Sequence, residues 1–289
     1  MTHSFRLRNK VRTETIPEVV IFTDTETRER SPGSRKTSLQ LVLGCYEVWT
    51  VGADGCRVKM VQSGTYWSED EYHELVDSFC DSRIVAHNWN FDASVLKIGS
   101  REYRERYSYT INVGNGIYPV SGQGQAPFFI VLQYPDKTVE MVCNTNFRRM
   151  PLAVIGESFG FPKGTMPDET EYEDGKEYLA DLETYCRRDV EILRESYFDL
   201  YDFTAEVTGT TPGFTAAMAA NRVYRTRYYD PSIKAQGTLG IPYISECERE
   251  AYHGGRTDTF WKGCPGDKDI YKYDVNSLYP YMMLSLIHI

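Results

Sequence analysis

Val19-Val20-Ile21-Phe22-Thr23-Asp24-Thr25-Glu26 is the stretch of sequence on which the fold depends most. Its first four residues form an apolar run of β-branched and aromatic side chains, which predicts a short buried strand. Asp24 and Glu26 follow at the end of that strand, and side chains at positions i and i+2 of an extended segment point to the same side. Carboxylate oxygens are the usual ligands of hard divalent cations. The stretch therefore predicts a pair of metal-binding carboxylates at the end of a buried strand.

A second strand of the same type is predicted at Ile84-Val85-Ala86-His87. It leads into Asn88-Trp89-Asn90-Phe91-Asp92, and Val95 and Leu96 then belong to an apolar helical stretch. We expect His87 to be a packed or hydrogen-bonding residue, because a lone histidine beside a strand end is rarely a ligand. Alone, Asn88 is typical of a turn.

A third group of polar residues lies in a long helical pattern from about Lys176 to Asp199. Tyr185 and Asp189 are four residues apart, so their side chains project next to each other on one face of the helix. Leu182 and Leu193 belong to the same face. Alone, Asp189 is typical of an exposed helix carboxylate paired with a neighbouring arginine.

Taken in order, these segments read Asp-x-Glu, Asn-x-x-Phe-Asp and Tyr-x-x-x-Asp, and together they resemble the three exonuclease motifs of the DEDD superfamily. The match is to the tyrosine subclass, which is found in family B DNA polymerases. Each motif alone is weak, and it is their order that makes the resemblance specific.

The resemblance implies a catalytic site that hydrolyses phosphodiester bonds at a single-stranded or frayed 3′ end with two Mg²⁺ or Mn²⁺ ions. Asp24, Glu26 and Asp189 are expected to hold one ion, and Asp24 with Asp92 the other. Tyr185 is expected to orient the attacking water, because a phenol with a pKa of about 10 is a poor base at neutral pH. Asn88 and Phe91 are expected to hold the terminal nucleotide, Phe91 by stacking.

Two further motifs lie near the end of the chain. Lys272-Tyr273-Asp274-Val275-Asn276-Ser277-Leu278-Tyr279-Pro280 resembles motif A of family B polymerases, and Tyr252-His253-Gly254-Gly255 resembles their Tyr-x-Gly-Gly element. Both together resemble the protein-primed branch, which serves phages, adenoviruses and linear plasmids.

The implied roles of these residues follow the resemblance. Asp274 is expected to bind magnesium as a catalytic ligand, and the backbone at Ser277 and Leu278 to cradle the incoming deoxynucleotide. Tyr279 is expected to pack under the sugar. Tyr252, Gly254 and Gly255 are expected to contact template phosphate, because glycines let the backbone approach a ligand closely. The implied partners are single-stranded DNA, primer-template DNA, deoxynucleotides and a terminal priming protein.

The chain departs from the family pattern between the second and third exonuclease motifs. Asn146-Phe147 stands where a Ser/Thr-Leu pair is expected, and no lysine stands at the start of the following helix. Lys163 is the nearest candidate for the lysine that the family often carries there.

The resemblance, together with the order of the predicted strands and helices, implies an α/β fold class, with a ribonuclease-H-like exonuclease domain followed by the first part of a polymerase palm. We expect a polar tail over 1–16, the exonuclease domain over 17–205, and the start of the polymerase domain over 206–283. Strands are predicted at 37–50 and 57–62, and a hairpin at 128–134 and 138–143. Ser68 and Glu71 form a capping box that predicts a helix with Tyr72, Leu75, Val76 and Phe79 facing inward. A polar segment over 216–227 is predicted to be helical.

The end of the sequence suggests a truncated gene. Only nine residues follow Pro280, and the last six, 284–289, resemble the translation of a sequencing adapter. A polymerase needs a second palm aspartate, so we expect no DNA synthesis from this chain alone.

Composition limits the possible classes of protein. The 289 residues are 41% hydrophobic and 25% charged, as in ordinary globular proteins, and no apolar run approaches the length of a membrane span. The seven cysteines are scattered, which fits a cytoplasmic compartment and argues against a zinc or disulfide framework. The net charge of −9 argues against simple DNA coating, although much of it comes from one acidic run over 168–183. We expect that run to be a solvated loop and first helical turn.

Two other classes of function remain open at this point. One is a stand-alone 3′–5′ exonuclease, against which the Tyr-x-Gly-Gly element and motif A argue. The other is a catalytically silent module that binds DNA or a terminal protein, against which the complete set of four exonuclease carboxylates argues.

Overall fold

The computed structural model describes residues 4–5, 16–29, 39–53, 55–113, 129–228 and 235–236. The chain divides into two compact units, Phe5–Ala235 and a second made of Met1–Ser4 and Gln236–Ile289. Nearly all described residues belong to the first unit. The predicted polymerase residues lie outside the described part of the chain: Tyr252, Gly254, Gly255, Asp274, Ser277, Leu278 and Tyr279.

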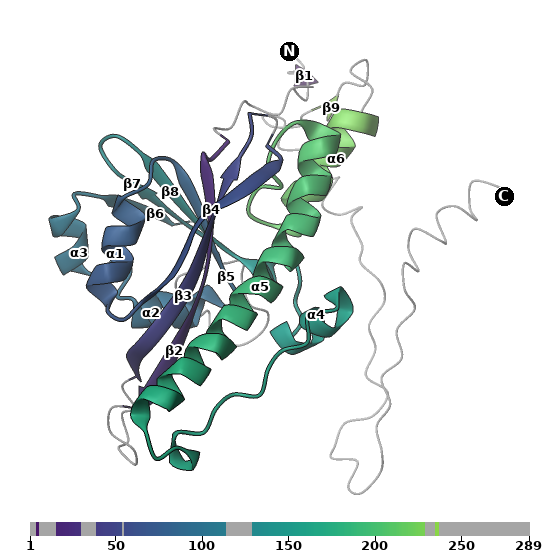
Figure 1. Ribbon diagram of the computed structural model, residues 1–289. Coiled ribbons are helices and arrows are strands. Elements are labelled where there is room, and N and C mark those ends of the chain that lie inside the picture. Colours follow the sequence, from purple (N-terminus) through teal and green to yellow (C-terminus); the bar gives the residue numbers. More distant parts are fainter. Residues whose placement is uncertain are drawn as a thin grey trace, which may run out of the picture. The chain divides into compact units, whose positions relative to one another are not determined.

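A seven-stranded mixed sheet forms the centre of the first unit (Figure 1). Its strands are β2 (Val19–Glu29), β3 (Leu39–Val51), β4 (Arg57–Tyr66), β5 (Ser82–Ala86), β6 (Thr110–Val113), β7 (Phe129–Gln133) and β8 (Thr138–Cys143). They lie in the order β4-β3-β2-β5-β8-β7-β6, with β5 parallel to both β2 and β8 and the remaining pairs antiparallel. Two strands of two residues each, β1 (Ser4–Phe5) and β9 (Ala235–Gln236), lie outside this sheet.

Strand β2 is longer than its apolar run predicts. It pairs with β3 as far as Glu29, with a bulge after Glu26, so the two carboxylates lie within the strand and not beyond its end. The pairing with β5 stops much earlier, at Phe22 opposite Val85. On the β5 side, β2 therefore has no strand partner at Asp24 and Glu26, and the sheet opens at the level of the carboxylates.

Each face of the sheet is covered by helices that bury one set of β2 side chains (Figure 1). Ile21 packs in the core shared with α1 (Glu69–Asp77), α2 (Trp89–Val95) and α3 (Arg101–Arg106). Phe22 packs in the core on the opposite face, beneath the long helix α5 (Gly175–Thr208). The alternation of side chains along β2 thus places neighbouring residues in different layers of the molecule.

Further helices lie among the described residues of this unit. They are the short helix η1 (Asn144–Asn146), α4 (Leu152–Phe159), η2 (Glu169–Glu171), α6 (Ala216–Val223) and the π-helical turn η3 (Tyr224–Tyr228). Leu152 and Ile155 of α4 pack against Ile192 of α5. The predicted helix over 216–227 forms as α6 and then continues with π-helical geometry in η3.

Several local predictions are confirmed. Ser68 caps α1 by accepting a hydrogen bond from the Glu71 amide at 3.2 Å. The prediction that Phe79 belongs to this helix is wrong, because α1 ends at Asp77 and Phe79 packs against the core only partly buried. The predicted hairpin forms from β7 and β8, with Gln133 opposite Thr138. Helix α5 continues past Asp199 to Thr208, because it keeps burying apolar residues such as Tyr201 and Ala205 against the sheet.

The α/β fold class predicted from the sequence is confirmed, while the expected palm segment falls outside the described residues. Among the described helices, none combines the length and the apolar character that crossing a membrane requires.

Candidate active site

A cavity of about 630 Å³ opens where β2 separates from β5. All seven residues predicted for the exonuclease site line this cavity: Asp24, Glu26, Asn88, Phe91, Asp92, Tyr185 and Asp189. They come from β2, from the start of α2 and from α5. Segments more than 160 residues apart along the chain therefore supply one group of side chains.

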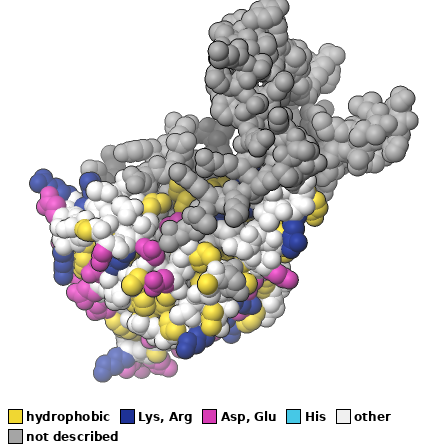
Figure 2. Space-filling view, turned by 90° about the horizontal axis from the view of Figure 1, so that it is seen from above, with side chains coloured by type: hydrophobic (Ala, Val, Ile, Leu, Met, Phe, Trp, Pro, Cys, Tyr) yellow, Lys and Arg dark blue, Asp and Glu magenta, His cyan; other side chains and the backbone are white. Residues whose placement is uncertain are grey.

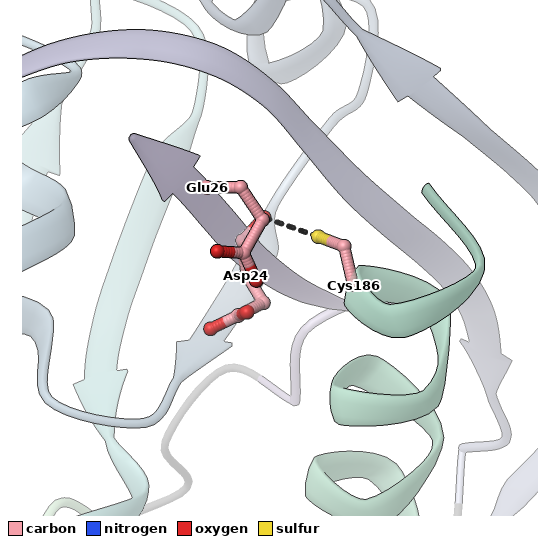
Figure 3. A group of neighbouring side chains, drawn as sticks. All are labelled: Asp24, Glu26 and Cys186. Atoms are coloured by element: carbon pink, nitrogen blue, oxygen red, sulfur yellow. Dashed lines mark hydrogen bonds between the residues drawn. The ribbon is translucent and has the colours of Figure 1, made fainter. Parts of the chain in front are cut away.

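Asp24 and Glu26 project from β2 towards the layer of α5 (Figure 3). One ligand atom from each lies within 4.8 Å of the Cys186 sulfur on α5. The Cys186 thiol donates a hydrogen bond of 3.5 Å to the main-chain carbonyl of Asp24. Burial raises the pKa of this thiol well above its usual value, so it remains protonated and anchors α5 to the strand.

Asn88 and Asp92 arrive from the other side of the sheet. Asn88 has a left-handed backbone conformation, with φ of 73°, and its amide donates to the Cys143 sulfur at 3.2 Å. This sharp turn starts α2 directly after β5. Asp92 is 2% exposed and accepts a hydrogen bond of 2.6 Å from the Thr25 hydroxyl.

Asp189 is buried, unlike the exposed helix carboxylate that its position alone suggests. Its Oδ2 accepts a hydrogen bond of 2.5 Å from the ammonium of Lys163. That ammonium also lies 4.9 Å from the centroid of the Tyr185 ring. Lys163 thus joins the side chains of the third motif, although it comes from the loop between α4 and α5.

The four carboxylates repel one another in a site that water reaches poorly. Burial, followed by repulsion from Asp92, Asp189 and Glu26, raises the pKa of Asp24 well above its ordinary value. Burial raises the pKa of Glu26 and that of Asp92 to about 7 each. The pKa of Asp189 is also raised by burial, against the opposing effect of the Lys163 ammonium.

These features fit divalent cations. Within the described part of the chain, Asp189 Oδ1 is a buried oxygen without a hydrogen-bond partner. The donors around the cavity are hard carboxylate oxygens, which suit Mg²⁺ or Mn²⁺. A bound cation would offset the burial that raises all four pKa values and the repulsion that adds to it at Asp24 and Glu26.

Without divalent cations, we expect the protein to lose stability as the pH rises from about 4 to about 7. Glu26 and Asp92 have higher pKa values in the folded state than their ordinary 4.5 and 3.8. Ionisation of these two carboxyls therefore does not lower the stability at a pH below their ordinary pKa values. The loss of stability is complete at a pH above their folded-state pKa values. We expect the Tm in EDTA to fall on the order of 5 °C across this range, measured by calorimetry.

The matched control for this pH dependence is the double variant Glu26→Gln and Asp92→Asn, whose two amides do not titrate. The fall in Tm should be smaller in this variant, and Mn²⁺ should remove the fall in the wild type. Parallel pH profiles for the two proteins would contradict the prediction.

The structure adds residues that the sequence motifs miss. Lys163 was only the nearest candidate for a family lysine, and it lies in an exposed loop that carries no periodic pattern. The motif Asp-x-Glu leaves the residue at the position of Thr25 unspecified. Arg149 lies exposed at the cavity within a basic pair that the sequence does show. Asn146, where the family pattern expects Ser or Thr, donates a hydrogen bond of 2.9 Å to the carbonyl of Phe214 and does not line the cavity.

Charge is mixed over the surface. Figure 2 shows Lys and Arg side chains interspersed with Asp and Glu on the visible face. The acidic run over 168–183 is mostly exposed and includes the start of α5, as predicted. The negative net charge therefore does not come from the cavity alone.

Comparisons with known proteins point to one family. Residues 156–288 match the family described as "DNA polymerase type B, organellar and viral". The DNA-directed DNA polymerase of Enterobacteria phage PRD1 is 30% identical over 139 residues, which are 48% of this chain and 22% of the phage protein. The chain thus spans about a fifth of the length of that curated relative.

The fold is similar to that of Phi29 DNA polymerase. Its complex with primer-template DNA and incoming nucleotide substrates gives a TM-score of 0.52 at 15% identity, over 83% of this chain and 40% of that one. Its binary complex with primer-template DNA gives 0.51 at 14% identity over the same shares. At these identities the likeness concerns the fold.

Proposed function

We propose that this chain is part of a protein-primed family B DNA polymerase of organellar and viral type, the family that residues 156–288 match. We further propose that its described unit is a 3′–5′ exonuclease. The observation that carries the proposal is the convergence of four carboxylates and a tyrosine in one cavity. These are Asp24, Glu26, Asp92, Asp189 and Tyr185.

Asp24, Glu26 and Asp189 would hold one divalent ion, and Asp24 with Asp92 the other. Such ions, when bound, lower the pKa of a water molecule and neutralise charge on the phosphate. A catalytically silent binding module would not need four carboxylates held together against their mutual repulsion. Removing one of them should therefore be favourable for folding and harmful for catalysis.

The other residues of the cavity have roles that follow from their chemistry. Burial raises the pKa of the Tyr185 phenol, so it stays neutral and orients the attacking water through its hydroxyl. Phe91 is 37% exposed, which leaves its ring free to stack on the terminal base. Asn88 lines the same cavity, and its side-chain amide would contact the terminal nucleotide. The substrate is single-stranded DNA with a free 3′ end.

The polymerase half of the proposal rests on sequence alone. Asp274 would bind a metal ion, Ser277 and Leu278 the triphosphate, and Tyr279 the sugar of the incoming deoxynucleotide. Tyr252, Gly254 and Gly255 would contact the template strand. Primer-template DNA and a terminal priming protein would be the partners of the whole enzyme.

The test is degradation of a 5′-labelled single-stranded oligonucleotide by the full chain with Mg²⁺ or Mn²⁺. We expect a ladder that shortens one nucleotide at a time from the 3′ end and stops in EDTA. A 3′-labelled oligonucleotide should release labelled mononucleotide at once. A phosphorothioate at the last linkage should slow the first step.

Two outcomes would overturn the exonuclease. One is release of a 5′-labelled mononucleotide, which indicates the opposite polarity. The other is an intact oligonucleotide with a folded protein that binds both Mn²⁺ and single-stranded DNA.

A further inference from the structure

The residue between the two carboxylates of β2 faces away from them. All three residues border the cavity, but the Thr25 side chain is 6% exposed and its hydroxyl is bonded to Asp92 of α2, on the other side of the sheet from α5. Because side chains alternate along a strand, the odd-numbered residues of β2 belong to that layer. Ile21 confirms the assignment, since it packs in the core shared with α1 to α3.

Asp92 reaches the cavity from the same layer. Its helix begins after β5 turns away at Asn88, which brings the first helical turn alongside β2 at Thr25. The Thr25 hydroxyl donates a hydrogen bond of 2.6 Å to Asp92 Oδ1, between two side chains that are almost completely buried. This bond is a direct side-chain link between the strand of the first motif and the helix of the second.

We propose that Thr25 is a positioning residue for the second metal ion, because its hydroxyl fixes the orientation of the Asp92 carboxylate. The inference rests on the proposed exonuclease function. The main chain of Asp24 is held by its own strand and by the Cys186 thiol on α5, whereas Asp92 is on a different element and a different face. Without the hydroxyl, the Asp92 carboxylate would keep only its hydrogen bonds from the main chain of Thr25 and Asp92. It would then hold a shared ion less tightly, since ligand orientation is set by hydrogen bonds behind the ligand.

Thr23 provides a matched control on the same strand and the same face. It is buried, and its hydroxyl donates to the Cys45 carbonyl at 3.0 Å and lies 2.8 Å from the Tyr66 hydroxyl. The Thr23 hydroxyl therefore makes the same kind of buried hydrogen bond without involving Asp92. A Thr→Val change at either position removes one buried hydroxyl from β2 at constant shape.

The experiment compares wild type, Thr25→Val, Thr25→Ser and Thr23→Val as full chains. Mn²⁺ binding is titrated in the absence of DNA by electron paramagnetic resonance of free Mn²⁺. We expect Thr25→Val to weaken one class of Mn²⁺ site by about 10- to 100-fold. Thr25→Ser should keep wild-type binding, and Thr23→Val should keep both sites even if its Tm falls.

Exonuclease kinetics provide the second readout. We expect Thr25→Val to need more Mg²⁺ for half-maximal rate and to have a lower kcat, while its Kd for single-stranded DNA in Ca²⁺ stays unchanged. Thr25→Ser should restore both values.

The outcomes separate this inference from the exonuclease itself. If the wild type degrades DNA but Thr25→Val binds Mn²⁺ as tightly as Thr23→Val does, the proposed role of Thr25 is wrong and the exonuclease function stands. Wild type that neither binds Mn²⁺ nor degrades DNA overturns the exonuclease function on which the role rests.

Discussion

Replacing Asp24 with alanine should reduce 3′–5′ degradation by on the order of 10³-fold or more, because this residue is expected to contact both metal ions. Asp24 lies at the centre of the acidic cluster, and the pKa of its carboxyl is raised by burial and by each of its three acidic neighbours. Loss of this ligand removes several kcal/mol of stabilisation from the transition state, which is the source of the expected factor. The measurement is the single-turnover rate on a 5′-labelled oligonucleotide with saturating Mg²⁺.

Asp24→Asn distinguishes a lost ligand from a lost fold. The amide has nearly the same shape but carries no charge, so the repulsion with Asp92, Asp189 and Glu26 disappears. We expect the metal-free variant to be more stable than wild type, with a Tm higher by about 3 °C. If the variant is inactive and its Tm is raised, Asp24 lowers the stability of the fold and is needed for function, as is typical of active-site residues.

An exposed carboxylate provides the control for Asp24. Asp136 lies in the turn between β7 and β8, away from the cavity. Asp136→Asn should leave both the rate and the Mn²⁺ affinity at wild-type values. Equal losses in Asp24→Asn and Asp136→Asn, or full activity in Asp24→Ala, would contradict the metal-binding role.

Replacing Lys163 with methionine should lower the exonuclease rate by about 10- to 100-fold, because a charge-assisted hydrogen bond contributes roughly 1.5–3 kcal/mol. The Lys163 ammonium lies 2.5 Å from Asp189 Oδ2 and 4.9 Å from the Tyr185 ring centroid. Burial lowers the pKa of Lys163 and the bonds to Asp189 and Tyr185 raise it, with a net value above the ordinary one. The lysine therefore stays charged and keeps Asp189 and Tyr185 in one arrangement.

Lys137 is a close match for Lys163 in an unrelated part of the fold. Its ammonium lies 3.1 Å from Asp77 Oδ1 and 4.8 Å from the Tyr134 ring centroid, so it also combines an ion pair with an aromatic contact. Lys137→Met should leave the exonuclease rate unchanged, although its Tm should fall. Lys163→Arg should retain part of the activity, since it keeps the charge but not the shape of the ammonium. Equal rates in Lys163→Met and Lys137→Met would show that Lys163 has no role at the site.

The predicted elements of the fold depend mostly on neighbours in sequence. The apolar run Val19–Phe22, the cap at Ser68 and the alternation in β7 and β8 each determine a strand, a helix start or a hairpin through local contacts. Strand β2 is longer than its apolar run predicts, because polar residues continue the strand. Pairing with β3 holds residues up to Glu29 in extended conformation, and that pairing is a long-range contact.

The carboxylates of the site could be predicted because the chemistry requires particular residue types at fixed spacing. Two acids at i and i+2 on a strand, and Tyr185 with Asp189 one helical turn apart, face the same way whatever surrounds them. The polymerase residues from Tyr252 to Tyr279 are predicted from the resemblance of their motifs alone, and they lie outside the described residues.

The sequence by itself thus determined through local periodicity that Asp24 faces with Glu26, and Tyr185 with Asp189. It determined the α/β class of the fold through the resemblance of its ordered motifs to a known family. Only the tertiary structure decided which residues support them. Lys163 reaches Asp189 from a loop 26 residues earlier, and Thr25 bonds Asp92 across 67 residues. Neither contact has a periodic signature, because each depends on the path of the chain after β5 and after α4. The physical reason is that local sequence sets the direction of a side chain, whereas packing between elements sets what that side chain meets.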